Sequence, residues 1–407
     1  MSFKSFMKAG HAPTLFAAFL YFDLSFMVWV LLGPLAVLMA ADLHLNAAQK
    51  GLMVAVPNLA GALLRVLMGL LVDHLGPKRA GVIGQVLVLA GLGVAWFFGI
   101  HSFHEALLLG VVLGMAGASF AVALPLASRW YPPEHQGAAL GIAGAGNSGT
   151  VLASLFAPAL ALSIGWNNVI GLAALPLAVA FLVYLVLARD APNPPPAKRG
   201  VEYLEVLKTS DAWAFMGFYS VTFGGFVGLS SSLPTYYNAQ YGLSPVTAGL
   251  FTAACVFAGS MVRPIGGALA DRFGGAKVLS AVYVVAAAAL IVASFGLHPA
   301  PLGLAVFVVA MLALGMGNGA VFQLVPQRFG REIGVMTGLV GMAGGVGGFY
   351  LASSLGFSKQ LTGQYQAGFL IFAALALVAL IGLVGMRRRL QATLPSAAAA
   401  AAAAAQA

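Results

Sequence analysis

Charged residues and cysteine are both scarce in this sequence. Only 8% of its 407 residues are Asp, Glu, Lys or Arg, whereas soluble domains carry about 25%. So few charges could not keep a soluble protein of this size in solution, which excludes an ordinary soluble domain. The single cysteine, Cys255, lies in an apolar segment, so an intrachain disulfide is impossible.

Apolar residues and glycine are abundant instead. Hydrophobic residues make up 61% of the chain, and there are 51 glycines, as in transmembrane helices that pack closely. Twelve apolar segments are long enough to cross a hydrocarbon core of about 30 Å. The sequence therefore predicts an all-α membrane protein with twelve transmembrane helices in a lipid bilayer. The predicted spans are 13–40, 49–72, 80–99, 105–128, 137–162, 168–188, 211–238, 246–270, 277–296, 301–326, 334–357 and 365–386.

The basic residues gather on one side of these spans. If the N-terminus is cytoplasmic, 16 of the 20 Lys and Arg residues face the cytoplasm, and only Lys50 and Lys359 lie outside. This bias predicts that both termini are cytoplasmic, in the inner membrane of a bacterium. The net charge of +9 is then a topology signal, and we expect no nucleic-acid partner. The 16 residues are Lys4, Lys8, Lys78, Arg79, Arg129, Arg189, Lys198, Arg199, Lys208, Arg272, Lys277, Arg328, Arg331, Arg387, Arg388 and Arg389.

The two remaining basic residues, Arg65 and Arg263, reveal an internal repeat. They lie 198 positions apart, and several neighbours recur at the same offset. We therefore predict two six-helix bundles, 1–188 and 211–386, joined by a proline-rich cytoplasmic linker, 189–210, and followed by a cytoplasmic tail, 387–407. The tail contains a run of nine alanines, 397–405, to which we assign no function. The recurring neighbours are Gly51, Leu52, Gly61, Gly69, Asp73 and Gly76, which return as Gly249, Leu250, Gly259, Gly267, Asp271 and Gly274.

A loop motif with glycine and aspartate joins spans 2 and 3 and recurs between spans 8 and 9. This motif resembles the signature of the major facilitator superfamily, and the resemblance covers nearly the whole chain. It implies that Asp73 and Asp271 brace the cytoplasmic ends of the helices. The residues assigned to this conformational motif are Gly69, Asp73, Gly76, Gly267, Asp271 and Arg272.

Arg65 and Arg263 both fall inside predicted spans, where a charge costs roughly 2.5–3.5 kcal/mol on the insertion scale. Of the eleven acidic residues, only Asp23 lies deep in an apolar segment. At least one arginine therefore lacks a carboxylate, which favours an anion-binding site over a purely structural network. One arginine from each half would hold the ligand near the pseudo-twofold axis at mid-membrane.

The chemistry of these arginines narrows the anion. A guanidinium presents parallel donors that match planar oxyanions such as carboxylate or nitrate, and also phosphate. Apart from Lys50 and Lys277 at span ends, no other Lys or Arg falls within the predicted spans. A small monovalent anion therefore fits better than a phosphate ester.

Glycine-rich segments occupy equivalent places in spans 5 and 11: Gly144-Ala-Gly-Asn-Ser-Gly149 and Gly341-Met-Ala-Gly-Gly-Val-Gly-Gly-Phe349. The first formally matches a dinucleotide fingerprint, but it follows no strand and lies within an apolar span. Such glycine density exposes backbone, and Asn147 beside it can donate hydrogen bonds to an anion.

With the two arginines, these segments resemble the nitrate/nitrite porter family of the NarK/NasA type. The resemblance implies that both arginines bind the anion and that aromatic residues sandwich it. The substrate-binding residues assigned in this way are Arg65, Arg263, Asn147, Phe120, Tyr219, Phe223, Gly144, Gly146, Gly344 and Gly345.

We therefore expect nitrate to be carried by alternating access, with nitrite as a candidate second substrate and with uptake by nitrate/proton symport favoured. Asp23 is the candidate for proton coupling. A nitrate/nitrite antiporter, a facilitator for a monocarboxylate and a non-transporting anion sensor stay open as alternatives. We expect a monomer without cofactor, metal site or enzymatic activity.

Overall fold

The computed structural model describes residues 6, 9–192, 200–329 and 333–393, and these ranges consist of helices and short connections. Twelve helical stretches in them are long and apolar enough to span a membrane, which confirms the predicted fold class. Lys4, Lys8, Lys198, Arg199, Arg331 and the alanine run of the predicted tail lie outside the described residues. The twelve stretches are Ala12–Asp42, Ala47–Leu75, Pro77–Phe98, Phe103–Ser128, Ala139–Ile164, Trp166–Leu187, Ser210–Tyr241, Pro245–Phe273, Gly275–Ser294, Ala300–Arg328, Val335–Thr362 and Gln366–Met386.

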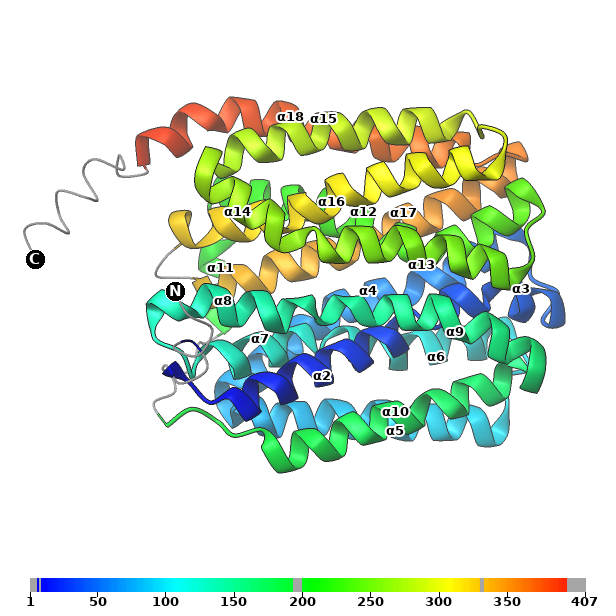
Figure 1. Cartoon of the computed structure of the whole chain (residues 1–407), viewed down its shortest axis with the longest axis horizontal. Helices are drawn as coiled ribbons and strands as arrows, with labels where there is room; N and C mark the ends of the chain where they lie inside the picture. Colours follow the sequence, from blue (N-terminus) through cyan, green and yellow to red (C-terminus); the bar gives the residue numbers. More distant parts are fainter. Residues whose placement is uncertain (1–5, 7–8, 193–199, 330–332, 394–407) are drawn as a thin grey trace, which may run out of the picture.

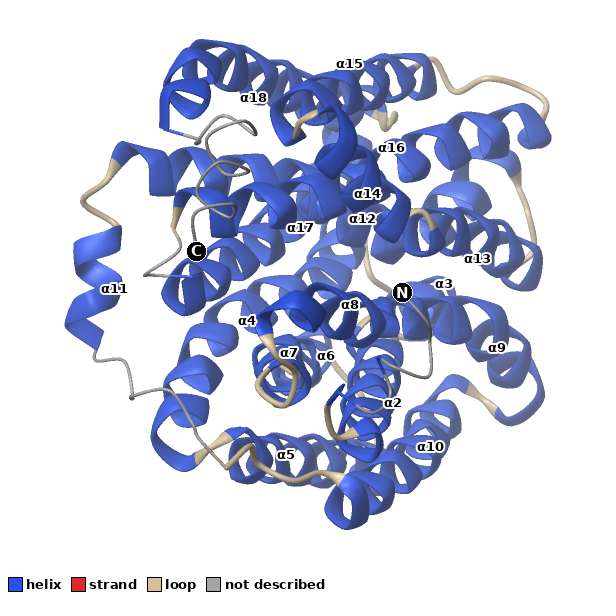
Figure 2. Ribbon diagram, turned by 60° about the vertical axis from the view of Figure 1, so that its left-hand side comes forward, coloured by secondary structure: helices blue, strands red, loops and turns tan. Residues whose placement is uncertain are grey.

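The helices form two groups that follow the sequence repeat. Viewed along the bundle, the helices up to α10 gather on one side and those from α12 onward on the other (Figure 2). The first group contains α2 (Ala12–Trp29), α3 (Leu32–Asp42), α4 (Ala47–Leu75), α5 (Pro77–Phe98), α6 (Phe103–Gly117), α7 (Phe120–Ser128), α8 (Pro133–Gly144), η1 (Ala145–Ser148), α9 (Gly149–Ile164) and α10 (Trp166–Leu187). The second contains α12 (Ser210–Tyr241), α13 (Pro245–Met261), α14 (Arg263–Phe273), α15 (Gly275–Ser294), α16 (Ala300–Arg328), α17 (Ile333–Thr362) and α18 (Gln366–Thr393).

The start of α2 and the end of α18 lie at the same end of the bundle (Figure 1). We call this the terminal end and the opposite one the distal end. The linker between the groups contains a short helix, α11 (Gly200–Val206), that the sequence analysis did not foresee.

Four of the twelve spans are interrupted, whereas the sequence predicted them as continuous. The breaks fall between α2 and α3, between α6 and α7, at the 3-10 turn η1, and between α13 and α14. The last break lies beside Pro264, whose missing N–H cannot support a continuous helix. The pattern of backbone N–H···O=C hydrogen bonds changes at such breaks, so some carbonyl oxygens can accept hydrogen bonds from side chains instead.

The two groups meet closely towards the distal end, where α4 and α17 run antiparallel. A Cβ added to Gly51 would lie 2.6 Å from the Cα of Gly356, and one added to Gly345 would lie 2.8 Å from the Cβ of Ala62. At the tip, the Ala47 N–H donates to Gln360 Oε1 over 3.1 Å. We call this stretch of α4 against α17, from Ala47 to Ala62, the distal contact.

A second pair of helices repeats this arrangement with the halves exchanged. A Cβ on Gly249 of α13 would lie 2.5 Å from the Ser154 carbonyl oxygen of α9. Between these pairs, α3 meets α12, where a Cβ on Gly33 would lie 2.6 Å from the Ser231 carbonyl oxygen. The two halves are therefore packed against each other at the distal end.

Candidate functional site

Arg65 lies on α4 and is only 1% exposed. Its Nε donates to the Gly117 carbonyl oxygen over 3.0 Å, and its Nη1 donates to the Gly341 carbonyl oxygen over 2.5 Å. In a continuous α-helix, the Ala121 N–H would donate to the Gly117 carbonyl oxygen. At the α6–α7 break it donates to the Ala118 carbonyl oxygen instead, which leaves the Gly117 carbonyl oxygen accessible to Arg65. Since Gly117 and Gly341 belong to different halves, Arg65 connects the halves directly.

Aromatic rings surround the Arg65 guanidinium. Its Cζ lies 5.0 Å from the ring centre of Trp29, 5.1 Å from Phe223, 5.2 Å from Phe120 and 6.0 Å from Phe26. Cation–π contacts and two carbonyls reduce the cost of burying this charge, but they do not neutralise it. Within the described ranges Arg65 has no carboxylate partner, and its Nη2 makes no hydrogen bond.

Arg263 is the first residue of α14 and is half-buried. Its Cζ lies 5.6 Å from the ring centre of Phe322, and 4.0 Å from where a Cβ on Gly144 would be. Among the described residues its Nη1 has no hydrogen-bond partner. The start of a helix carries partial positive charge, which adds to the attraction for an anion at this point.

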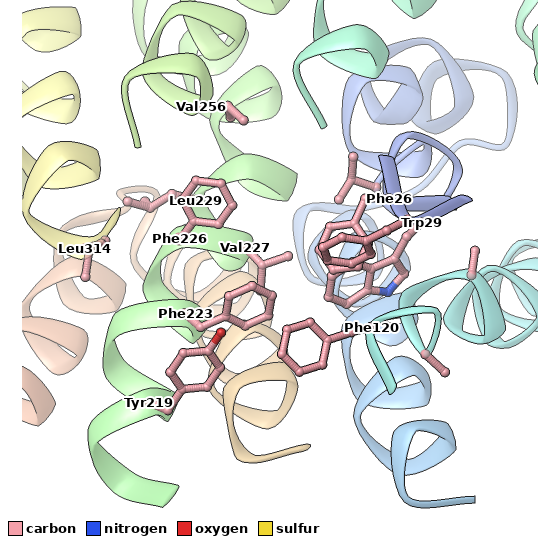
Figure 3. Packing of buried hydrophobic residues seen from close by; sticks show 14 of the residues in the cluster. Phe26, Trp29, Phe120, Tyr219, Phe223, Phe226, Val227, Leu229, Val256 and Leu314 are labelled. Atoms are coloured by element: carbon pink, nitrogen blue, oxygen red, sulfur yellow. The ribbon is translucent and has the colours of Figure 1, made fainter. Parts of the chain in front are cut away.

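Tyr219 of α12 interacts with both arginines, and Phe223 beside it adjoins Arg65. Their rings stack at 5.1 Å with an interplanar angle of 4°, and Phe120 approaches from the other half (Figure 3). The Tyr219 hydroxyl interacts electrostatically with both guanidinium groups, which also act on each other. Tyr219 is fully buried, and its hydroxyl lies within hydrogen-bonding reach of Arg263 but makes no well-aligned hydrogen bond in the part of the chain that the structure describes.

The predicted glycines have three different surroundings. Gly144 adjoins Arg263, and a Cβ on Gly344 would lie 2.8 Å from the rings of Tyr219 and Phe223, so both line the site. Gly345 instead lets α17 approach α4. Gly146 packs against α2, where its Cβ would lie 2.6 Å from the Phe22 ring, so the structure places it outside the arginine cluster.

Asn147 and Asp23 lie near the helix break at η1. Asn147 is fully buried, and neither of its amide atoms has a hydrogen-bond partner among the described residues. Asp23 on α2 is 8% exposed and accepts a 2.7 Å hydrogen bond from Ser148 Oγ. The structure shows no ion pair between Asp23 and either arginine in the described ranges.

The two copies of the loop motif differ at the terminal end. Asp73 accepts from Arg129 Nη2 over 3.2 Å, which ties α4 to the end of α7. Gly76 has a φ of +83°, a conformation that favours glycine at this turn. Asp271 is exposed and has no such ion pair in the described part of the chain, while Arg272 lies 5.2 Å from the Phe273 ring.

Sequence reasoning missed several residues of the site. Phe322 of α16 contacts Arg263, and its ring centre lies 5.0 Å from that of Tyr219 and 5.9 Å from that of Phe120. Trp29 and Phe26 of α2 adjoin Arg65. With 27 phenylalanines in the chain, only their distances to the arginines single these residues out.

The fold and the site together define a multi-pass membrane transporter built from two similar halves, with an aromatic-lined pair of arginines between them. Residues 16–352 match the sequence profile of the Major Facilitator Superfamily. The chain belongs to this superfamily and, within it, to the nitrate/nitrite porter family.

Curated relatives support the narrower assignment. The "Probable nitrate/nitrite transporter NarK2" of Mycobacterium tuberculosis is 35% identical over 91% of this chain and 95% of its own length. The "Nitrite extrusion protein" of Bacillus subtilis is 32% identical over 86% of this chain and 88% of its own length. The "Probable nitrate/nitrite antiporter NarK1" of Thermus thermophilus is 30% identical over 88% of both chains.

Among solved structures, a bacterial homologue of the human lysosomal transporter Spinster has the same fold. Its inward-facing, unoccupied form superposes with a TM-score of 0.72 at 18% identity, over 95% of this chain and 99% of that one. The inward-facing, occupied form gives 0.70 at 19% identity, over 94% and 98%. At these identities the likeness concerns the fold alone.

Proposed function

We propose that this protein carries nitrate across the bacterial inner membrane by alternating access, with the anion bound between Arg65 and Arg263. The observation that carries the proposal is the burial of Arg65 without a carboxylate partner in the described ranges. An uncompensated buried charge is unfavourable, and a bound anion would remove the cost.

The donors in the site suit a small planar oxyanion. Arg65 Nη2 and Arg263 Nη1 have no partner among the described residues, so each arginine offers at least one donor. The stacked rings of Tyr219 and Phe223 add flat, apolar surface beside Arg65. Two positive charges in such surroundings favour a singly charged, weakly hydrated anion over a larger, highly charged one. The names of the curated relatives point to nitrate and nitrite.

The packing of the halves supports an inward-facing state. The distal contact is closed, and the bias of basic residues favours a cytoplasmic terminal end. Arg65 and Arg263 repel each other, so bringing the terminal ends together is costly without an anion. A bound nitrate would lower that cost and drive the conformational change.

Asp23 is our candidate for proton coupling. It lies in α2 beside the broken span 5, and Ser148 is its hydrogen-bond donor. A carboxylate that is not held in an ion pair with arginine can gain and lose a proton during the cycle. On this basis we favour nitrate uptake with a proton.

Nitrate/nitrite exchange is the second candidate function. The repulsion between the two arginines favours it, because an empty carrier would close poorly and the return step would need an anion. The antiporter name of the Thermus relative agrees with this candidate.

The test is nitrate counterflow in proteoliposomes with wild type, Arg65→Lys and Arg263→Lys. Lysine keeps the charge but loses the planar fork, so we expect each mutant to lose at least about tenfold in rate, as for one charged hydrogen bond of about 1.5–3 kcal/mol. Arg79→Lys, at an exposed arginine, is the matched control and should transport normally. Normal counterflow in both site mutants would refute the proposed anion site.

Two further outcomes separate the remaining alternatives. Competition by monocarboxylates as strong as that by unlabelled nitrate would indicate a facilitator for another small anion. Binding of nitrate without counterflow would indicate an anion sensor that does not transport.

A further inference from the structure

Asn58 is a fully buried polar residue that the proposed site does not include. It lies on α4, seven residues before Arg65, and therefore two turns further towards the distal end on the same face. In the part of the chain that the structure describes, neither its Nδ2 nor its Oδ1 has a hydrogen-bond partner. A buried amide without a partner is unfavourable in the closed state, so its presence calls for an explanation.

The Asn58 side chain is directed at the other half of the protein. Its Nδ2 lies 3.5 Å from where a Cβ on Gly348 of α17 would be, and the backbone carbonyl oxygen of Asn58 lies 2.9 Å from the corresponding point on Gly345. The amide is therefore enclosed within the distal contact, between two helices that belong to different halves.

The antiparallel register of α4 and α17 links Asn58 to Arg65. Arg65 faces Gly341, Ala62 faces Gly345, and Asn58 faces Gly348. The two polar side chains of α4 thus lie along one line of contact, and α17 opposes them with glycines. If the halves separate at the distal end, this line becomes a path from the distal side to Arg65, with Asn58 reached first.

The internal repeat argues against a purely structural role. At the offset of 198 residues, Asn58 corresponds to Val256 of α13, which is also fully buried. Helix packing at this position therefore works with an apolar residue. A structural amide would bond across the helix interface, but Asn58 makes no such bond to any described residue.

We propose that Asn58 is a substrate-binding residue of the distal-open state, where its amide donates a hydrogen bond to the anion before the anion reaches Arg65. The proposal rests on the proposed nitrate transport and deepens it, because it makes binding from the two sides unequal. The ligand class is a small oxyanion. From the terminal side, the same anion reaches the arginines while Asn58 stays enclosed.

The experiment measures the apparent KM for labelled nitrate separately at each face, in right-side-out and inside-out membrane vesicles that contain saturating unlabelled nitrate. We compare wild type with Asn58→Val, which installs the residue of the other half, and with Asn58→Ser, which keeps a donor. Leu63→Ala, at an exposed residue of the same helix outside the distal contact, is the control for general disturbance of α4 and should leave both KM values unchanged.

We expect Asn58→Val to raise the KM at the distal face about tenfold or more, the effect of one hydrogen bond to a charged group. The KM at the terminal face should stay within about twofold of wild type, and Asn58→Ser should recover much of the loss. Unchanged KM values at both faces, or an equal rise at both, would overturn the proposal.

A rise at the distal face with a matching fall at the terminal face would also overturn it, because that pattern indicates a shift between the two states. Absence of nitrate counterflow in wild-type vesicles would instead refute the proposed function, so the two failures can be distinguished.

Discussion

Arg65 and Arg263 occupy equivalent positions in the repeat, yet their surroundings differ. Arg65 is fully enclosed, with two carbonyl partners and four aromatic rings. Arg263 is half-buried, begins a helix and lies near the Phe322 ring and the Tyr219 hydroxyl. In this state Arg65 therefore contributes to the contact between the halves, whereas Arg263 keeps more of its donors available to an arriving anion.

Tyr219 allows a sharp test at the residue scale. Its hydroxyl interacts with both arginines and lies within hydrogen-bonding reach of Arg263, but no well-aligned hydrogen bond holds it in the described ranges. We expect Tyr219→Phe to raise the KM for nitrate by roughly threefold to tenfold, since a hydrogen bond to the anion contributes about 1 kcal/mol. Thermal stability in detergent should not fall, because the folded protein loses no hydrogen bond.

Tyr283→Phe is the matched control and should behave in the opposite way. The Tyr283 hydroxyl donates to the Phe218 carbonyl oxygen over 2.9 Å inside the second half. Its loss should lower the melting temperature and leave the KM unchanged. If Tyr219→Phe also lowered stability without changing the KM, the tyrosine would be a packing residue only.

At the residue scale, the sequence predicted the charged residues of the site more completely than its aromatic residues. Arg65 and Asp23 stand out because a charge in an apolar span is rare and costly. Phe322 and Trp29 were missed, because aromatic residues are ordinary in such spans and only three-dimensional distance connects them to an arginine. Gly146 was assigned to the site from its motif, whereas in the structure its nearest neighbours belong to α2.

At the scale of elements, glycine decides how closely helices of opposite halves approach. The Gly51 and Gly356 backbones touch at the distal contact, with a Cβ on Gly51 only 2.6 Å from the Gly356 Cα. Backbone atoms on both sides leave no side chain that could move aside. Any larger residue at Gly51 must therefore push α4 away from α17.

We predict that Gly51→Ala impairs closure of the distal end and reduces nitrate counterflow at least about fivefold, while the protein stays folded and monodisperse. The physical reason is the steric clash, whose typical cost is about 1–3 kcal/mol. Gly93→Ala on α5 is the control, because no atom lies within 4 Å of its added Cβ. That change should leave transport normal and raise helix stability by about 0.5–1 kcal/mol. Equal transport in both mutants would contradict the role given to the distal contact.

The same scale shows what hydropathy cannot predict. The spans were foreseen to within a few residues, because length and apolar character set them. The breaks at η1 and between α13 and α14 were not foreseen, because the breaks do not change mean hydropathy. These breaks place Asn147 and Arg263 at helix ends. The features that hydropathy could not predict therefore lie within the candidate site.

At the scale of the whole molecule, the two candidate functions differ in whether a proton or an anion accompanies nitrate. Asp23 lies on α2 and reaches Ser148 of η1, so its hydrogen bond connects two spans that both border the other half. Protonation of the carboxylate would change that connection during the cycle. If nitrate is carried together with a proton, Asp23 is therefore essential for accumulation of nitrate but dispensable for nitrate exchange.

We predict that Asp23→Asn abolishes nitrate accumulation driven by a pH gradient, alkaline inside, and keeps nitrate counterflow within about threefold of wild type, because the Asn oxygen still accepts one neutral hydrogen bond from Ser148. Asp42→Asn is the control, since Asp42 lies at the distal end and accepts from Trp166 Nε1. Asp42→Asn should keep both accumulation and counterflow.

Full proton-driven accumulation of nitrate by Asp23→Asn would show that Asp23 takes no part in proton coupling. A wild type that exchanges nitrate for nitrite but never accumulates nitrate under the gradient would instead establish the antiporter, since the two buried arginines would then require an anion on every return.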